Sequence, residues 1–118
     1  MSIALTTELV PLSSFLKNVS TQSHESLDKR IMSLAPFSSR ERYALFVRTQ
    51  ARLHQAAAPW FQNQALQTWL PGLSERDRHT AVLHDCQDLG IAPNEQAEDA
   101  LAASQVKIND PYTALGWI

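Results

Sequence analysis

The stretch LSSFLKNVSTQSHESLDKRIMSL, from Leu12 to Leu34, decides the fold expected of this chain. Its apolar residues recur at the three- and four-residue spacing of an α-helix and share one broad face. These residues are Leu12, Phe15, Leu16, Val19, Leu27, Ile31 and Leu34. The pattern predicts a core-packing helix that begins near Pro11 or slightly earlier and ends before Pro36, because a residue preceding proline disfavours the helical conformation.

The rest of the chain has the same helical character. It contains only three glycines in 118 residues and few alternating β-branched positions, so we predict an all-α fold forming a single domain over residues 1–118. Further helices are expected at Ser39–Ala57, Trp60–Leu70, from Ser74 to Gly90, at about Gln96–Ser104, and from Asp110 onward.

Several of these helices carry start or stop signals. Ser38 with Glu41 three residues later matches a capping box, and Ser74 is a second candidate N-cap. Gly90 is placed to terminate the fourth helix. Asp110 followed by proline predicts the start of a last helix. We expect the sequence to stop at Ile118 in the middle of this helix.

Composition excludes several classes of function. The net charge is −2, which gives no sign of a nucleic-acid partner, and no window approaches the ~20 apolar residues needed for membrane insertion. The first eight residues, MSIALTTE, lack the basic leader of a signal peptide. A single cysteine, Cys86, excludes an intrachain disulfide and is expected to be a small buried side chain. We therefore predict a cytoplasmic protein.

Common catalytic motifs are absent from the sequence. It has no glycine-rich phosphate loop, no Gly-x-Ser-x-Gly elbow and no paired-cysteine metal motif. His79 and His84 are five residues apart and are expected to face solvent, and His54 is expected to be a surface or hydrogen-bonded histidine. Arg48 and Arg52 share one helix face, which we expect to be solvated or to meet an acidic redox partner.

The histidine of the first helix lies beside its apolar face. His24 shares one strip along the edge of that face with Lys17 and Asp28. Because helical side chains lean toward the N-terminus, Asp28 points back at the ring and could accept its second N–H directly or through water. Spacing alone is compatible with two interpretations of this strip: an ordinary solvated helix edge without a ligand, or an iron-binding site.

Five segments, taken in order, carry a resemblance to a known family. They are SHESLD (23–28), APFSSRERYALFV (35–47), LPGLSER (70–76), DLG (88–90) and ALGWI (114–118). In this order the chain resembles the bacterial biliverdin-producing haem oxygenases over almost its whole length. The resemblance implies a haem oxygenase-like all-α fold in which haem lies between a proximal helix and a glycine-rich distal helix.

The resemblance also implies roles for individual residues. His24 would be the proximal haem iron ligand, and Asp28 would replace the carboxylate that hydrogen-bonds it. Lys17 matches a position that contacts a haem propionate. The ~10 Å between Lys17 and His24 along the helix is a plausible distance from the haem iron to a propionate. Leu27 and Ile31 would face the haem. The resemblance identifies no catalytic residue among residues 1–118.

The expected chemistry follows from the same resemblance. Haem b, with its iron, would be both cofactor and substrate, cleaved with O2 to biliverdin, CO and ferrous iron. Electrons would come from a ferredoxin or a flavin reductase. In the family, Ala-Leu-Gly-Trp opens the distal helix, so we expect this chain to be the N-terminal, proximal-helix part of such an enzyme. Two alternatives stay open: a non-catalytic haem-binding remnant, and a helical protein-interaction module in which His24 is idle.

Overall fold

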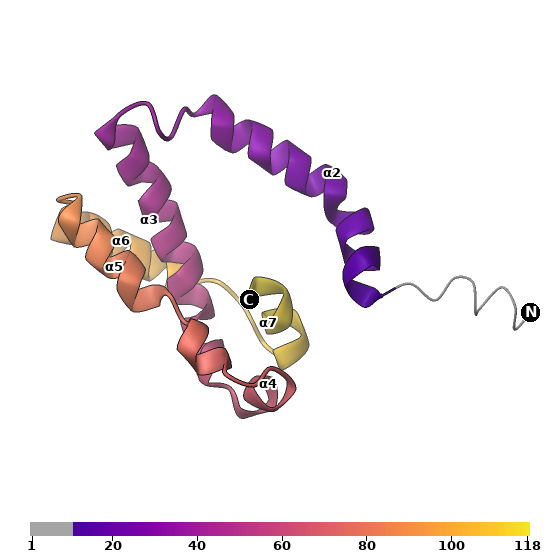
Figure 1. Ribbon diagram of the computed structural model, residues 1–118. Helices are drawn as coiled ribbons and strands as arrows, with labels where there is room; N and C mark the ends of the chain where they lie inside the picture. Colours follow the sequence, from indigo (N-terminus) through magenta and orange to yellow (C-terminus); the bar gives the residue numbers. More distant parts are fainter. Residues whose placement is uncertain (1–10) are drawn as a thin grey trace, which may run out of the picture. The chain divides into compact units, whose positions relative to one another are not determined.

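The computed structural model describes residues 11–118, which form helices and contain no strand. The all-α prediction is confirmed for these residues (Figure 1). The chain divides into two compact units, Met1–Pro36 and Phe37–Ile118, each described by itself below. The prediction that residues 1–8 hold no signal peptide lies outside the described residues, and the single-domain interpretation stays a prediction.

The first unit is described by one long helix, α2, at Leu12–Ser33. It begins directly after Pro11 and ends before Pro36, as the sequence predicts. The carbonyl of Pro11 accepts the N–H of Phe15 at 3.1 Å, which fixes the first turn. At the other end Ala35 adopts a left-handed backbone with φ of 48°. A left-handed residue just past a helix is a common way to stop it, although glycine usually fills that place.

The second unit opens with α3 at Arg40–Ala57. Its N-cap is Ser39, whose hydroxyl accepts the N–H of Arg42 at 3.1 Å. The capping box predicted at Ser38 is therefore wrong by one residue. Ser39 has the extended backbone that an N-cap needs, with φ of −155° and ψ of 163°, so its oxygen reaches back to the first turn.

Replacing Ser39 with alanine is expected to lower the free energy of unfolding by about 1 kcal/mol, because the Arg42 N–H loses its acceptor. Urea denaturation followed by circular dichroism measures the change. Ser39→Asp keeps an acceptor at the same position and is the matched control. An alanine variant as stable as the parent chain would show that this cap contributes nothing.

The segment after α3 is more broken than predicted. Trp60–Leu70 was expected to be one helix, but the chain forms a 3₁₀ helix at Ala58–Gln62 (η1) and a short helix α4 at Gln64–Trp69. Asn63 separates them, and its side-chain oxygen accepts the N–H of Leu66 at 3.1 Å. Asparagine at this position caps a new helix, and so the earlier one cannot continue.

The predicted N-cap at Ser74 is also wrong. Ser74 lies inside a second 3₁₀ helix, Leu73–Arg76 (η2), and the following helix α5 spans His79–Asp88. The N-cap of α5 is Arg78, and the carboxylate of Asp77 just before it accepts the N–H of His79, the first residue of the helix, at 3.0 Å. The predicted terminator is correct: Gly90 has φ of 71°, and the N–H of Ile91 bonds to the carbonyl of Cys86 as in a Schellman motif.

Two further helices complete the unit. Helix α6 spans Pro93–Ser104, which is longer and better formed than the weak helix expected there. The last, α7, spans Pro111–Trp117. Its N-cap is Asp110, as predicted, with a carboxylate oxygen 2.9 Å from the N–H of Thr113.

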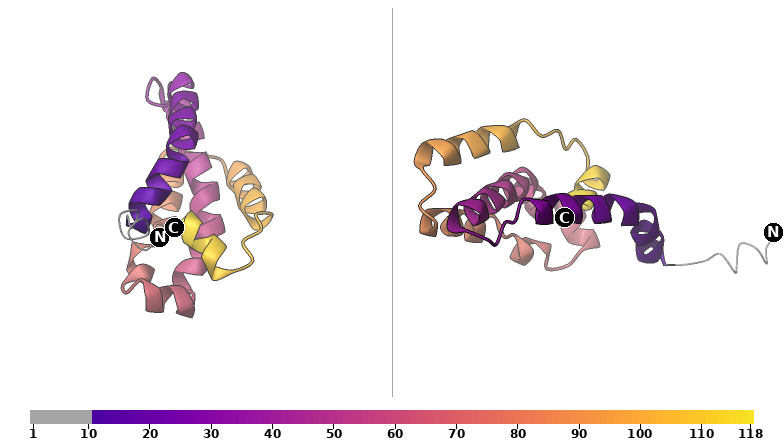
Figure 2. Two further views of the ribbon diagram at one scale, coloured as in Figure 1. Left: turned by 90° about the vertical axis from the view of Figure 1, so that its right-hand side faces the viewer. Right: turned by 90° about the horizontal axis from the view of Figure 1, so that it is seen from above.

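Helix α3 is the centre of the Phe37–Ile118 unit, with α5 on one side and α6 on the other (Figure 2). Two apolar clusters hold these elements together. One joins α3 to α5 through Val47, Ala51, Cys86 and Ile91. The other gathers the segments that follow α3, through Ala57, Phe61, Leu66, Leu73 and Ala114. Cys86 is buried, as predicted.

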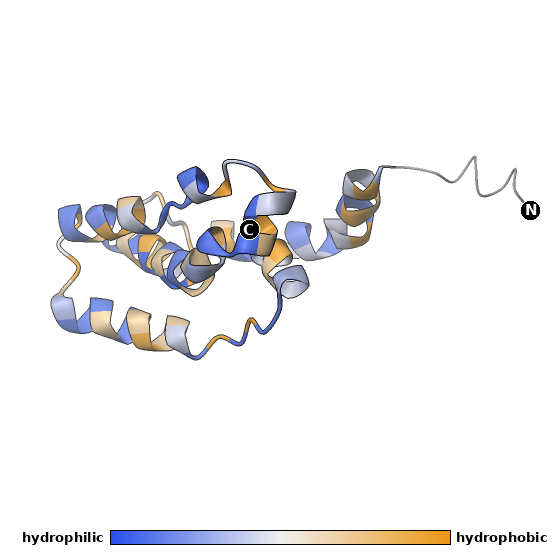
Figure 3. Cartoon of the chain, turned by 90° about the horizontal axis from the view of Figure 1, so that it is seen from below, coloured by the Kyte–Doolittle hydropathy of each residue, from blue (hydrophilic) through white to orange (hydrophobic). Residues whose placement is uncertain are grey.

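The helices of this unit carry both hydrophilic and hydrophobic residues (Figure 3). This mixture is typical of amphipathic helices that bury one side. Among the described residues, no helix combines the length and the apolar character that a membrane crossing requires.

Candidate functional site

The strip predicted on the first helix lies within regular α-helix. His24, Asp28 and Lys17 all belong to α2, and all three side chains are exposed. Spacings of four and seven residues therefore place them along one edge, as the sequence analysis required. Among the described residues, no direct hydrogen bond joins the His24 ring to Asp28.

Two small residues lie one turn before the histidine, and the sequence analysis did not single them out. The hydroxyl of Ser20 donates to the carbonyl of Leu16 at 2.7 Å, and that of Thr21 donates to the carbonyl of Lys17 at 2.6 Å. Both hydroxyl protons are thus used within the helix. Since helical side chains lean toward the N-terminus, the His24 ring is expected to lie over this turn of small residues.

The apolar side of the strip is accessible. Leu27 is 55% exposed, and Ile31 is half-buried. No residue of α2 is buried. Within its unit, α2 therefore presents an apolar face with one imidazole at its edge.

These residues fit haem by the chemistry of their donors. A porphyrin supplies four ligands to its iron, so one imidazole is a sufficient protein ligand. A nearby carboxylate can orient the ring, a lysine two turns away suits a propionate, and leucine and isoleucine suit the macrocycle. A bare metal ion needs more protein ligands, and the described residues hold no group of three or more His, Cys, Asp or Glu side chains that could supply them.

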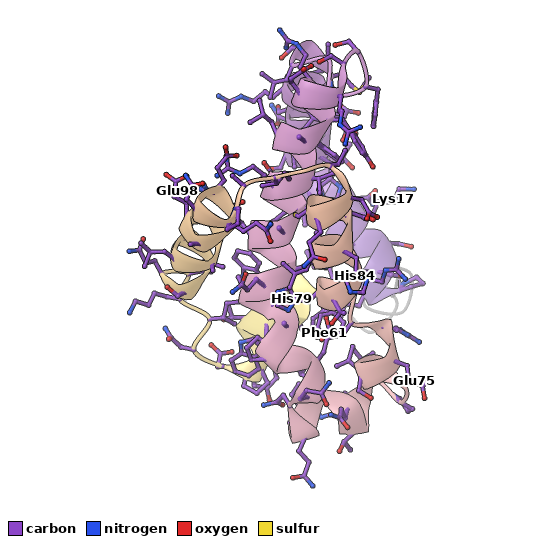
Figure 4. All side chains as sticks on the ribbon, turned by 90° about the vertical axis from the view of Figure 1, so that its left-hand side faces the viewer. Lys17, Phe61, Glu75, His79, His84 and Glu98 are labelled. Atoms are coloured by element: carbon purple, nitrogen blue, oxygen red, sulfur yellow. The ribbon has the colours of Figure 1, made fainter. Side chains whose placement is uncertain are left out.

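The other histidines lie in the second unit. His54 on α3 is half-buried, and His84 on α5 is exposed, as predicted. The prediction that His79 faces solvent is wrong, because this residue is half-buried and its ring Nε2 is buried with no hydrogen-bond partner among residues 11–118. Figure 4 labels His79 and His84 on α5. Solvent exposure of His79 was predicted from the polar sequence around it, which does not show how the start of α5 packs.

The two arginines expected to be solvated or to meet a redox partner are bound within the chain. Arg48 and Arg52 both pair with Asp99 of α6, which is 2% exposed. The Arg48 Nε lies 2.9 Å from one carboxylate oxygen of Asp99, and the Arg52 Nε lies 2.6 Å from the other. The expectation that both arginines are solvated or meet a partner is wrong, because α6 packs on α3 and brings Asp99 to them from a distant part of the sequence.

Two more carboxylates extend this network. Arg48 also bonds to Glu95 at 3.0 Å and to Glu98 at 3.3 Å. Glu98 lies at the outer side of α6 (Figure 4) and is 68% exposed. The network is therefore buried at Asp99 and open to water at its rim.

The electrostatics follow from this arrangement. Burial acts to raise the pKa of Asp99, but the hydrogen bonds from Arg48 and Arg52 outweigh it and lower the pKa below its usual value. The hydrogen bond to Asp99 raises the pKa of Arg48. Burial, with the nearby Asp99 charge, raises the pKa of Cys86, so this thiol stays protonated and unreactive.

Two open surface hollows lie in the second unit. One has a volume of about 300 Å³ and lies between the end of α3 and the α6–α7 segment. Trp60 and Ile108 are among the residues that line it. The other, of about 440 Å³, lies between α3 and the α5–α6 corner and includes Leu45 and Glu95. Neither is lined by the residues predicted for the haem site.

The chain is similar to a curated protein over most of its length. It is 30% identical over 103 residues to the heme oxygenase PigA of Pseudomonas aeruginosa, and the match covers 87% of this chain and 50% of that protein. The chain thus spans about half the length of this relative. No protein-family model matches the chain, and no solved structure matches it significantly. The similarity supports a distant relationship to the heme oxygenases, with which the all-α fold is consistent.

Proposed function

We propose that this chain binds haem through His24 and serves in oxidative haem degradation. The observation that carries the proposal is an exposed imidazole at the apolar edge of α2, flanked by Asp28 and Lys17. The similarity to a protein named as a heme oxygenase supports the same chemistry. Bound haem would supply the iron at which O2 reacts, and its macrocycle would be cleaved to biliverdin with release of CO and ferrous iron.

The side chains of α2 have distinct tasks in this proposal. A ring nitrogen of His24 binds the iron. Asp28 accepts the N–H of the other ring nitrogen, which fixes the tautomer and the orientation of the ring. Lys17 pairs with a propionate. Leu27 and Ile31 lie against the macrocycle and exclude water from it. Electrons are expected from a ferredoxin or a flavin reductase.

Titration with hemin tests the ligand assignment. His24→Ala is expected to weaken hemin binding at least ~10-fold and to abolish the shift of the Soret band, because the iron loses its protein ligand. The matched control is His84→Ala, which removes another exposed histidine and should bind hemin like the parent chain. Equal binding by the His24 variant and the parent chain would refute the assignment.

The oxygenase reaction is tested separately from binding. With ascorbate or a reductase, the oxygenase function predicts loss of the Soret band and formation of biliverdin. A complex that binds hemin through His24 but yields no biliverdin would favour a non-catalytic haem-binding protein.

A further inference from the structure

Helix α6 packs on α3 with very little apolar surface. Its buried residues are Asp99 and Ala103, while its largest apolar side chain, Leu101, is 61% exposed. Among the described residues, neither apolar cluster includes a residue of α6. Helix α5 differs, because it contributes Cys86 and Val82 to the cluster on α3. Hydrophobic burial therefore holds α5 to α3 but contributes little to the attachment of α6.

Charged groups supply the attachment of α6 instead. Glu95 lies three residues before Glu98 and four before Asp99, so the three carboxylates share one face of the helix. Arg48 pairs with all three carboxylates, and Arg52 donates to Asp99 at 2.6 Å. Without the arginines, the acids would repel one another. In the docked position the charges of α6 are therefore balanced by those of α3.

Both ends of α6 are joined to the unit by chain that is not α-helical. Residues 89–92 lead into the helix, and residues 105–110 follow it. Ile91 belongs to the α3–α5 cluster, and Ile108 packs against the cluster around Ala57. Figure 2 shows α6 beside α3 between these two connections. The helix can therefore move away from α3 as a unit while both connections stay anchored.

We infer that α6 is a strap, held on α3 by its carboxylate–arginine pairs, which releases while the other helices of the Phe37–Ile118 unit stay folded. The inference goes beyond the proposed haem function and does not depend on it, since every group involved lies in the second unit. The two apolar clusters survive the release because α6 contributes to neither. Release also widens the hollow of about 300 Å³, whose wall includes Ala100, Ala103 and Ser104 of α6.

Acid is the expected trigger of release. Protonation removes the charge of a carboxylate, whereas the guanidinium groups of Arg48 and Arg52 stay charged. Because the pKa of Asp99 is lowered in the docked state, its contribution to docking is fully present above the usual carboxyl pKa of about 4 and is lost as the pH falls through the lowered value. The other ionisable groups near the network are Arg40 and Glu41 of α3, which line the hollow beside Glu95, and Asp85 and Cys86 of α5.

Hydrogen exchange of individual amides, measured by NMR on the 118-residue chain, tests the strap. Lowering the pH from 7 to about 3 is expected to remove the protection of the central α6 amides, while the amides of α3 and α5 remain at least ~100-fold protected. If α6 keeps its protection at this pH, or loses it together with α3 and α5, the inference fails.

Variants test the same point at pH 7. Leu66→Ala lies outside α6 and should lower the protection of the most protected amides of the unit at least ~10-fold, but should leave α6 protection unchanged within ~2-fold. Asp99→Asn removes the charge that both arginines share and should lower α6 protection at least ~10-fold. Leu101→Ala removes an exposed α6 side chain and is the control that should leave α6 protection unchanged.

The outcome of the Leu66 variant is decisive, because it separates local release from global unfolding. An equal loss of protection in α6 and in the most protected amides would show that α6 opens only when the whole unit unfolds, and would overturn the strap. If the Leu66 variant does not fold, the acid response of the parent chain decides the question.

Discussion

Replacing Asp99 with asparagine is expected to lower the free energy of unfolding by about 3 kcal/mol, because it leaves two guanidinium groups beside a buried amide. The Asp99 side chain is only 3% exposed, and it joins α6 to Arg48 and Arg52 of α3. Asparagine has nearly the same shape, so the loss reflects charge and hydrogen bonding rather than packing. Urea denaturation measures it.

The matched control for this experiment is Glu98→Gln. Glu98 pairs with the same arginine at 3.3 Å but is 68% exposed, so its loss should cost less than about 1 kcal/mol. Equal effects at the two positions would contradict the assignment of Asp99 as the buried centre of the network.

The same residue predicts a pH dependence. The pKa of Asp99 is lowered in the folded chain, so its contribution to stability is fully present above the usual carboxyl pKa of about 4 and is lost as the pH falls through the folded value. The difference in unfolding free energy between the parent chain and Asp99→Asn is therefore expected to stay constant from pH 7 to about 5 and to narrow below about pH 4. A difference that is unchanged at low pH would refute this.

Replacing Leu66 with alanine is expected to lower the free energy of unfolding by about 3 kcal/mol. Leu66 on α4 has no exposed surface and belongs to the cluster with Phe61 and Leu73. Alanine removes buried methyl groups and leaves a cavity between η1, α4 and η2. Thermal unfolding followed by circular dichroism should show a marked fall in the midpoint temperature.

A matched leucine is available for this comparison. Leu101 on α6 is 61% exposed, so Leu101→Ala removes the same atoms where water already reaches them. Its effect should be below about 0.5 kcal/mol. If Leu66→Ala is no more harmful than Leu101→Ala, the cluster around α4 does not stabilise the unit.

Much of the helical order could be predicted from local signals. Pro11 and Pro36 bracket α2, Gly90 ends α5, and Asp110 with Pro111 starts α7. Each of these signals acts within a few residues, so no knowledge of the rest of the chain is needed. The errors at Ser38 and Ser74 arose where several polar residues compete to cap the next helix.

The candidate site could also be predicted from the sequence only in part. The common edge of His24, Asp28 and Lys17 follows from helix geometry alone, because all three lie on one continuous helix. Their binding of haem stays a proposal. The small turn at Ser20 and Thr21 could have been found from the same spacing, four and three residues before the histidine.

The sequence by itself determined the all-α class, the bounds of α2, the start of α7, and the strip of residues along one helix, since these depend on spacing and on nearby caps. Only the tertiary structure decided the partners of Arg48. The acid that neutralises it, Asp99, is 51 positions away, and that pairing depends on how α6 packs against α3. A helix-face pattern shows which residues share a side, but not which distant segment covers it.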